Sequence, residues 1–205
     1  MIDIEKVLLS LSQNRKVFFS EADFQFSLAL EIQKEYPEVD VRPEYCPYEL
    51  HKNMHIDILV IKDGLWIPIE LKYKTKGELI NYNNEVYHLK NHGAQDLGRY
   101  DFLKDVSRIE YIKNNISNFK EGYAILLTND PSYLLKASKD CIYNNFSLEN
   151  GIVKNGILSW SEAASIGTTK NRDKPIQIIG SYLLDWKEFS NINDITFKYL
   201  SIRVI

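Results

Sequence analysis

One stretch of the sequence constrains the fold more than any other: residues 55–74, which read HIDILVIKDGLWIPIELKYK. An Asp-Gly pair, Asp63-Gly64, separates two runs rich in Ile, Leu, Val and Trp, and this pattern is a strong signal for a two-residue hairpin turn. Counting outward from the turn places Asp57 directly opposite Glu70. We therefore predict two antiparallel strands with a fixed register.

Alternation along these strands separates an apolar face from a charged face, because successive side chains of a strand point to opposite sides. The charged face carries Asp57, Glu70, Lys72 and Lys74. The apolar face is expected to belong to the core. It consists of Ile56, Ile58, Val60, Ile67, Ile69 and Leu71.

The charged face has the composition of a metal site. Two carboxylates directly opposite each other repel unless something positive lies between them. Carboxylate and backbone carbonyl oxygens suit Mg²⁺ or Mn²⁺, and a nearby lysine can position or activate a water or stabilise negative charge on a phosphate. This combination favours the hydrolysis of phosphodiesters.

The order Asp57, then Glu70-Leu71-Lys72, resembles the PD-(D/E)xK nuclease superfamily, which has the restriction-endonuclease-like fold; here HID stands in place of PD. The wider pattern SEADFQ, ELKYK and GAQDLGRYDFLKD is similar to a group of uncharacterised bacterial members, over about residues 18–130. The resemblance implies that Asp57 and Glu70 bind the metal, with the Leu71 carbonyl as a further ligand. It also implies that Lys72 assists the attacking water.

A helix is expected over residues 20–36, with Ser20 as its N-cap. It resembles the first helix of the nuclease fold, which often contributes a glutamate to the metal site. The resemblance assigns Glu21 as a metal ligand and places Gln25 beside it as a candidate substrate contact. An alternative stays open, in which Glu21 is a first-turn acid that the helix dipole stabilises.

A long amphipathic helix is expected over residues 94–116. Gln95 and Arg99 share one side near its start, where free backbone N–H groups attract phosphate and an arginine can bind it in bidentate fashion. Both are therefore candidate substrate-binding residues. The alternative is a surface ion pair of Arg99 with Asp96 or Asp101.

The remaining elements are predicted from alternation and turn residues. Residues 168–175 form a basic loop that is either solvated or a mobile contact. A short helix is expected over residues 2–12, strands over 39–45 and 122–128, a hairpin over 78–89 turning at Asn83-Asn84, and two further strands within 176–186 and 197–205.

These elements predict an α/β (α+β) restriction-endonuclease-like fold, with a mixed central sheet flanked by the helices over 20–36 and 94–116. An extra hairpin and C-terminal strands are added to it. A length of 205 residues fits a single domain over residues 1–205. Its core covers about residues 18–130, and residues 131–205 form a C-terminal extension.

Composition narrows the class of protein. Hydrophobic residues at 44% and charged residues at 26% are typical of a globular domain. A net charge of −3 argues against nonspecific coating of nucleic acid but allows a local basic groove. No run is long enough to span a membrane, and Cys46 and Cys141 lack the spacing of a metal site or a disulfide scaffold. We expect a cytoplasmic protein without a membrane partner, and a homo-oligomer stays open.

The leading hypothesis is a nuclease that depends on Mg²⁺ or Mn²⁺ and acts on DNA; the choice of DNA over RNA rests on the resemblance. A rival hypothesis is a noncatalytic nucleic-acid-binding or assembly module that retains the nuclease fold. A third treats Asp57, Glu70 and Lys72 as solvent-facing strand charges of a small-molecule enzyme.

Overall fold

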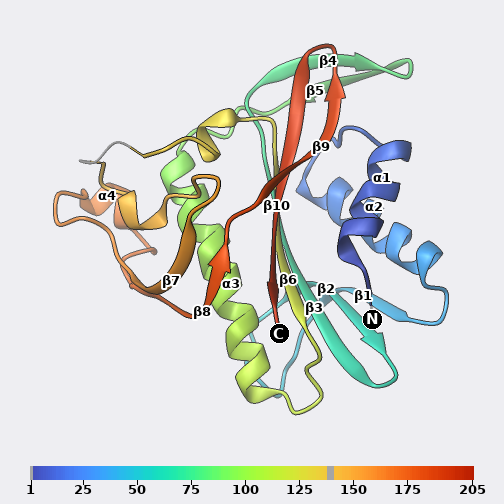
Figure 1. Cartoon of the computed structure of the whole chain (residues 1–205), viewed down its shortest axis with the longest axis horizontal. Helices are drawn as coiled ribbons and strands as arrows, with labels where there is room; N and C mark the ends of the chain where they lie inside the picture. Colours follow the sequence, from blue (N-terminus) through green and yellow to red (C-terminus); the bar gives the residue numbers. More distant parts are fainter. Residues whose placement is uncertain (1, 138–140) are drawn as a thin grey trace.

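A six-stranded mixed sheet with strand order β1-β2-β3-β6-β10-β9 forms the centre of the structure (Figure 1). This computed structural model describes residues 2–137 and 141–205; Met1 and residues 138–140, within the predicted C-terminal extension, lie outside the described residues. β3 and β6 are parallel, and the other neighbouring pairs are antiparallel. The strands are β1 Asp40–Tyr45, β2 Ile56–Lys62, β3 Leu65–Lys74, β6 Gly122–Thr128, β9 Trp186–Ile192 and β10 Ile195–Val204.

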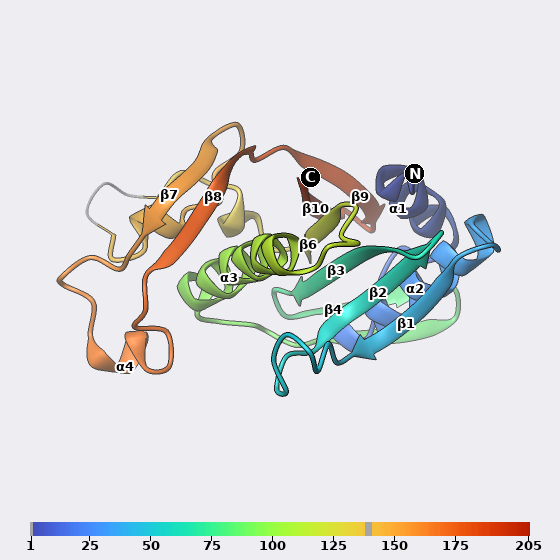
Figure 2. The same cartoon turned by 90° about the horizontal axis from the view of Figure 1, so that it is seen from below.

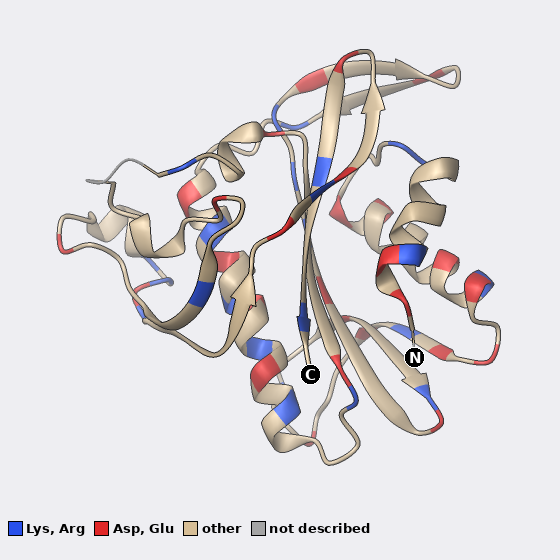
Figure 3. Cartoon of the chain, in the orientation of Figure 1, with Lys and Arg blue, Asp and Glu red and all other residues tan. Residues whose placement is uncertain are grey.

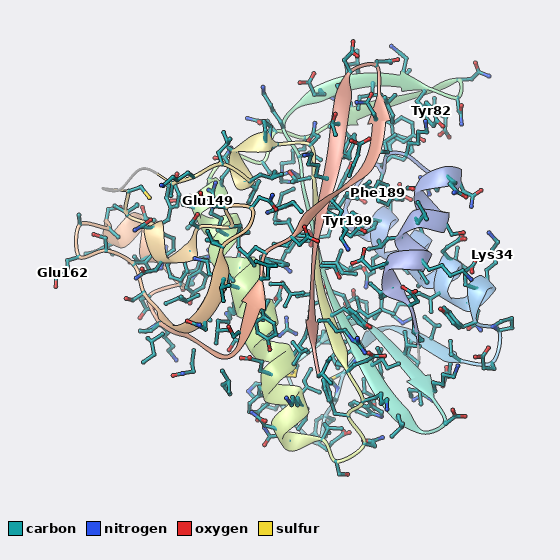
Figure 4. All side chains as sticks on the ribbon, in the orientation of Figure 1. Lys34, Tyr82, Glu149, Glu162, Phe189 and Tyr199 are labelled. Atoms are coloured by element: carbon teal, nitrogen blue, oxygen red, sulfur yellow. The ribbon has the colours of Figure 1, made fainter. Side chains whose placement is uncertain are left out.

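Helices cover both faces of this sheet, as expected for an α+β protein (Figure 1). α1 (Ile4–Asn14) and α2 (Glu21–Glu35) pack on one face, and α3 (Gln95–Asn115) packs on the other. Phe189 on β9 and Tyr199 on β10, both labelled in Figure 4, belong to the same hydrophobic cluster as the buried residues of α1 and α2. Among the described residues, no helix is long and apolar enough to cross a membrane.

The β2–β3 hairpin has the predicted register from the Ile58/Ile69 pair to the Lys62/Leu65 pair, and the predicted pair of Asp57 with Glu70 lies beyond these paired residues. Asp63 and Gly64 both adopt positive φ, and Leu59 lies opposite Pro68. Pro68 has no N–H, so it fits a pair at which the ladder needs none. The apolar residues from Ile58 to Leu71 pack toward α1 and α2 as expected, but Ile56 belongs to a separate cluster. Ile56 pairs with Tyr45 of β1 and packs with Leu59, Trp66 and Ile112, so its contacts are with α3.

The predicted hairpin beyond β3 is also present, as β4 (Glu78–Tyr82) and β5 (Glu85–Leu89). It turns at Asn83-Asn84, both with positive φ. Figure 1 shows it at one end of the central sheet.

The described residues of the C-terminal part form four strands rather than the two predicted. β9 and β10 form a hairpin that turns at Asn193-Asp194 and completes the central sheet beside β6. β7 (Val153–Leu158) and β8 (Ile176–Leu183) form a second two-stranded sheet, and α3 lies between it and the central sheet (Figure 2). The predicted extension therefore supplies two strands of the central sheet and a separate two-stranded sheet.

The basic loop at residues 168–175 is largely exposed to solvent but is held against α3. Its first two residues end the short helix α4 (Ile166–Thr169), and Arg172 makes two hydrogen bonds of 2.7 Å to the carboxylate of Asp101 on α3. Tyr100 donates a hydrogen bond of 2.9 Å to the carbonyl of Lys174. Two short 3₁₀ turns, Pro131–Tyr133 and Asn144–Phe146, complete the described elements of this part.

Candidate active site

The candidate site lies where β2 and β3 separate. The pairing of these strands ends at Ile58 and Ile69, while β3 continues to Lys74 beside β6. Beyond that point, carboxylates replace the missing strand partner. Asp57 Oδ2 accepts a hydrogen bond of 2.6 Å from the Leu71 N–H, and Glu21 Oε2 accepts one of 2.8 Å from the Tyr73 N–H.

Glu21 therefore does more than stabilise the helix start. Ser20 caps α2 through its side chain, and the Glu21 carboxylate lies 3.6 Å from the Lys74 ammonium in addition to its bond with β3. Its position in the first turn still suits the helix dipole. Glu21 thus ties α2 to the free edge of β3, next to Asp57.

Glu70 and Lys72 face α3. The Lys72 Nζ atom lies 2.6 Å from Asp105 Oδ2 and donates a hydrogen bond of 3.0 Å to the Leu71 carbonyl. Glu70 Oε1 lies 3.1 Å from the Arg108 guanidinium. Acidic and basic positions alternate along α3, as Figure 3 shows, and this brings both signs of charge to β3.

Glu70 is buried, and its carboxylate has an ion-pair partner but no hydrogen bond among the residues described. The residue is 1% exposed, which excludes a solvent-facing strand charge. Neither of its oxygens makes a hydrogen bond within the described residues, and Asp105 Oδ2 makes none either, although ion pairs with Arg108 and Lys72 lie close. Such buried acceptors destabilise a protein unless a partner is supplied.

Burial raises the pKa of three carboxyl groups, those of Asp57, Glu70 and Asp105, which together form the carboxylate cluster of the site. Burial and the Asp105 carboxylate raise the pKa of Glu70 well above its usual value. Burial also raises the pKa of Asp57, and it raises the pKa of Asp105 against the opposing effect of Lys72. For Lys72, burial acts to lower the pKa, but Asp105 outweighs it and the pKa is raised. Perturbed groups of this kind gather at functional sites.

The donor set fits a hydrated divalent cation. Among residues 2–137 and 141–205, no three or more His, Cys, Asp or Glu side chains are arranged to hold a metal ion. Mg²⁺, however, is commonly bound through one or two carboxylates with waters completing its shell. Asp57, Glu70 and the Leu71 carbonyl are the groups that could hold such an ion, and the Glu70 oxygens make no hydrogen bond to these residues that would have to be broken.

Gln25 lies at the edge of the cluster as a supporting residue. Its amide donates hydrogen bonds of 2.6 Å to the Asp57 carbonyl and of 2.6 Å to Glu44 Oε1. Gln25 is 7% exposed, so both donors of its amide are already used inside the protein. It fixes the backbone that carries Asp57.

Gln95 and Arg99 lie apart from the cluster, in a pocket of about 280 Å³. Gln95 donates to Asp130, and Arg99 donates to the Ser132 carbonyl, with its guanidinium against the rings of Tyr133 and Tyr143. Six residues separate Arg99 from Asp105, about 9 Å along the helix axis.

The surface ion pair considered for Arg99 is wrong. Arg99 is 3% exposed, and among the described residues it pairs with neither Asp96 nor Asp101. Asp101 binds Arg172 instead. The partner of Arg99 is set by packing between the start of α3 and the segment after β6. The sequence near Arg99 does not reveal this packing.

Asp105 and Arg108 are site residues that the sequence reasoning missed. A signal existed, because Asp105 lies three residues after Phe102 and four before Ile109, both fully buried. A carboxylate on the buried side of a helix must meet a partner. If the helix over 94–116 had been packed against the strand that contains Glu70-Leu71-Lys72, Lys72 would have been the expected partner of Asp105.

Comparison with known proteins gives no match: no protein-family model matches the chain, and no curated protein matches it.

Proposed function

We propose that this protein is a metal-dependent nuclease that hydrolyses phosphodiester bonds in DNA, with Mg²⁺ or Mn²⁺ as its cofactor. One observation carries the proposal: Glu70 is buried beside Asp57 with both oxygens lacking a hydrogen bond, and Lys72 lies on the same strand. These are the residues expected from the nuclease resemblance. A buried carboxylate that makes no hydrogen bond in the described part of the chain and has one ion-pair partner there, Arg108, has a physical reason to exist if a metal cation also binds it.

The arrangement of elements supports a restriction-endonuclease-like core. The chain runs through α2, the antiparallel strands β1, β2 and β3, then α3, and returns in β6 parallel to β3. This is the order expected from the resemblance, with β4 and β5 inserted before α3. β9 and β10 extend the same sheet beyond that core.

In this proposal Asp57, Glu70 and the Leu71 carbonyl hold the metal, with Glu21 beside them. A bound divalent cation supplies Lewis-acid stabilisation of the phosphate and lowers the pKa of a water. Lys72 donates hydrogen bonds as an ammonium, since both atoms that it contacts, the Leu71 carbonyl oxygen and Asp105 Oδ2, are acceptors. It therefore orients the attacking water or stabilises negative charge on the phosphate.

The reaction itself adds the hydroxyl of water to phosphorus and breaks one phosphorus–oxygen ester bond. The proton of that water passes to the leaving oxygen. Asp105 keeps the Lys72 ammonium at the edge of β3 where this takes place. Arg108, close to Glu70, adds a second cation near the phosphate.

The rival hypothesis of a noncatalytic module is less favoured. Such a module has no use for buried carboxyl groups whose pKa is raised by burial and by one another. It would nevertheless bind nucleic acid without cleaving it, so a cleavage assay separates the two hypotheses.

The experiment is cleavage of single-stranded, duplex and branched DNA and RNA with Mn²⁺, with Mg²⁺ and with EDTA. We expect metal-dependent cleavage of DNA that falls by about 10²-fold or more in Lys72→Ala. Lys62→Ala, on the same hairpin and paired with Glu38, is the matched control and should keep full activity. Circular dichroism checks that each variant is folded. Absence of cleavage on every substrate, or undiminished cleavage in Glu70→Gln, would overturn the proposal.

A further inference from the structure

A groove of about 660 Å³ runs beside the candidate site, between α3 and the loop that follows α4. Lys104, Arg108 and Tyr111 line it from α3, Lys174 lines it from the loop, and Met54 lines it from the segment before β2. In Figure 2 the α4 segment and the loop before β2 both lie at the lower side of the view, with α3 above them. The groove is thus built from three separate parts of the chain.

The groove carries uncompensated positive charge. Lys104 and Lys174 are exposed, and neither ammonium has an ion-pair partner among the residues that the structure describes. Asp173 is the single acidic residue in the described lining. Two free cations on opposite walls favour an anionic ligand that extends along the groove.

Arg108 connects the groove to the carboxylate cluster. Its guanidinium contacts Glu70 at 3.1 Å and Asp105 at 3.4 Å, and it donates a hydrogen bond to the His55 carbonyl. The side chain is 28% exposed, on the groove side. A phosphate in the groove can therefore reach the guanidinium at the point nearest to Glu70, where bidentate binding is available.

Tyr111 gives the groove an aromatic surface. The residue is 45% exposed and lies one helical turn beyond Arg108 on α3. Bases of a single strand stack on such rings, and this contact tolerates any sequence. Alternation of cations with an accessible ring is the chemistry of a single-strand site.

The walls of the groove are fixed in advance. Arg172 binds Asp101 through two hydrogen bonds, and the Tyr100 hydroxyl donates to the Lys174 carbonyl, so the loop is tied to α3 on both sides of Asp173. Binding does not have to order this loop, so the loss of conformational entropy on binding is smaller than it would be for a flexible loop.

We propose that this groove binds a single strand of nucleic acid. Arg108 binds the phosphate nearest to the carboxylate cluster, Lys104 and Lys174 bind flanking phosphates, and Tyr111 stacks on a base. A volume of about 660 Å³ encloses a few nucleotides of one strand, not a double helix. The inference rests on the proposed nuclease function and names its substrate class: single-stranded DNA or a single-stranded end.

The test measures binding without cleavage. A fluorescently labelled oligothymidylate is titrated in EDTA, by anisotropy at several salt concentrations, with wild type and with the double variant Lys104→Gln/Lys174→Gln. We expect a clear loss of affinity and a salt dependence of log K that is smaller by about 1.4, since each single-strand phosphate contact contributes about 0.7. Arg108→Lys and Tyr111→Ala should lower affinity without changing that slope, because neither changes the charge.

The matched control is Lys6→Gln/Lys34→Gln, which removes the same charge from α1 and α2. Figure 4 labels Lys34 there, away from α3, and both lysines pair with glutamates. The control should bind as wild type does. Equal losses in the two double variants, or a duplex of the same length that binds as tightly as the single strand, would overturn the groove assignment.

Measuring both binding and cleavage with these variants separates failure of this inference from failure of the proposed function. Metal-dependent cleavage by wild type that is undiminished in Lys104→Gln/Lys174→Gln would overturn the groove alone. Binding that depends on the groove residues, with no cleavage in any metal, would keep the groove and overturn the nuclease.

Discussion

The ammonium group of Lys72 on β3 lies 2.6 Å from Oδ2 of Asp105 on α3. Both side chains are largely buried, at 17% and 7% exposure, and the same ammonium also donates to the Leu71 carbonyl. The metal proposed for this site would share that carbonyl. Asp105 therefore determines how far Lys72 lies from the metal ligands, although it is in neither strand of the hairpin.

The first prediction concerns this ion pair. Asp105→Ala removes the nearest counter-charge of the buried Lys72 ammonium, so we expect the free energy of unfolding to fall by about 3 kcal/mol. Urea denaturation followed by circular dichroism measures it. Asp40→Ala removes the exposed pair with Arg42 and should cost about 1 kcal/mol or less. Similar losses in both variants would mean that the buried pair has no special role.

The second prediction distinguishes the two facing carboxylates. Glu70→Gln removes a buried charge whose oxygens lack hydrogen bonds, so it should stabilise the metal-free protein by on the order of 1 kcal/mol. Asp57→Asn should give no such gain, because the Asp57 carboxylate accepts a hydrogen bond from the Leu71 N–H and its charge strengthens that bond. Thermal melts in EDTA compare the two variants with wild type.

The same melts, repeated with Mn²⁺, test the metal assignment. A ligand that binds only the folded state raises the melting temperature by mass action. We expect that rise in wild type and little of it in Glu70→Gln. A full metal response in the variant, together with a destabilised metal-free form, would show that Glu70 is structural.

Local signals account for the parts of the fold that the sequence predicted correctly. Asp63-Gly64 needs positive φ at both positions, which selects one turn and one register for β2 and β3. Ser20 caps α2, and its bond to the Asp23 N–H needs only the next turn of chain. The proximity of Asp57, Glu70 and Lys72 could be predicted because all three belong to one hairpin.

One local turn was missed: Asn193-Asp194 has the same positive φ at both positions as Asn83-Asn84, yet only the Asn83-Asn84 hairpin was predicted. Tertiary packing accounts for the other parts that were missed. Asp105 and Arg108 join the site because α3 packs across β3, more than 30 residues away in sequence. The surface ion pair considered for Arg99 was wrong for the same reason, since its partner Ser132 follows β6.

The third prediction concerns a close approach of α3 to the segment after β6. A Cβ atom at Gly98 would overlap the hydroxyl oxygen of Tyr133, which is 1% exposed. Alanine normally stabilises a helix relative to glycine by about 1 kcal/mol, but overpacking here should reverse the sign and destabilise by about 1–3 kcal/mol.

Chemical denaturation of three variants tests this reversal. Tyr133→Phe removes the hydroxyl, so the double variant Gly98→Ala/Tyr133→Phe should recover part of the loss. Gly167→Ala, in α4, meets only the Ser165 hydroxyl oxygen at an ordinary 3.7 Å and serves as the control. If Gly98→Ala is as well tolerated as the control, the close approach does not constrain α3.

The last prediction uses Lys154, a buried lysine on β7. It is 7% exposed, and its ammonium donates a hydrogen bond of 2.8 Å to the Asn145 carbonyl. Burial lowers the pKa of Lys154 to about 8 from its usual 10.5, with only Glu149 acting in the opposite direction. Below pH 8 the folded protein therefore carries a buried charge that the unfolded chain holds in water.

Stability should rise with pH between about 8 and 10.5, because in that window the unfolded chain binds a proton that the folded protein has released. Lys154→Met cannot titrate, so its stability relative to wild type should be greatest below pH 8 and should decline as the pH rises. Lys154→Arg keeps its charge throughout and should become progressively less stable than wild type over the same window. Urea denaturation of the three proteins from pH 7 to pH 10 measures both differences. Differences that do not change with pH would mean that Lys154 keeps its proton in the fold, with the hydrogen bond to Asn145 outweighing its burial.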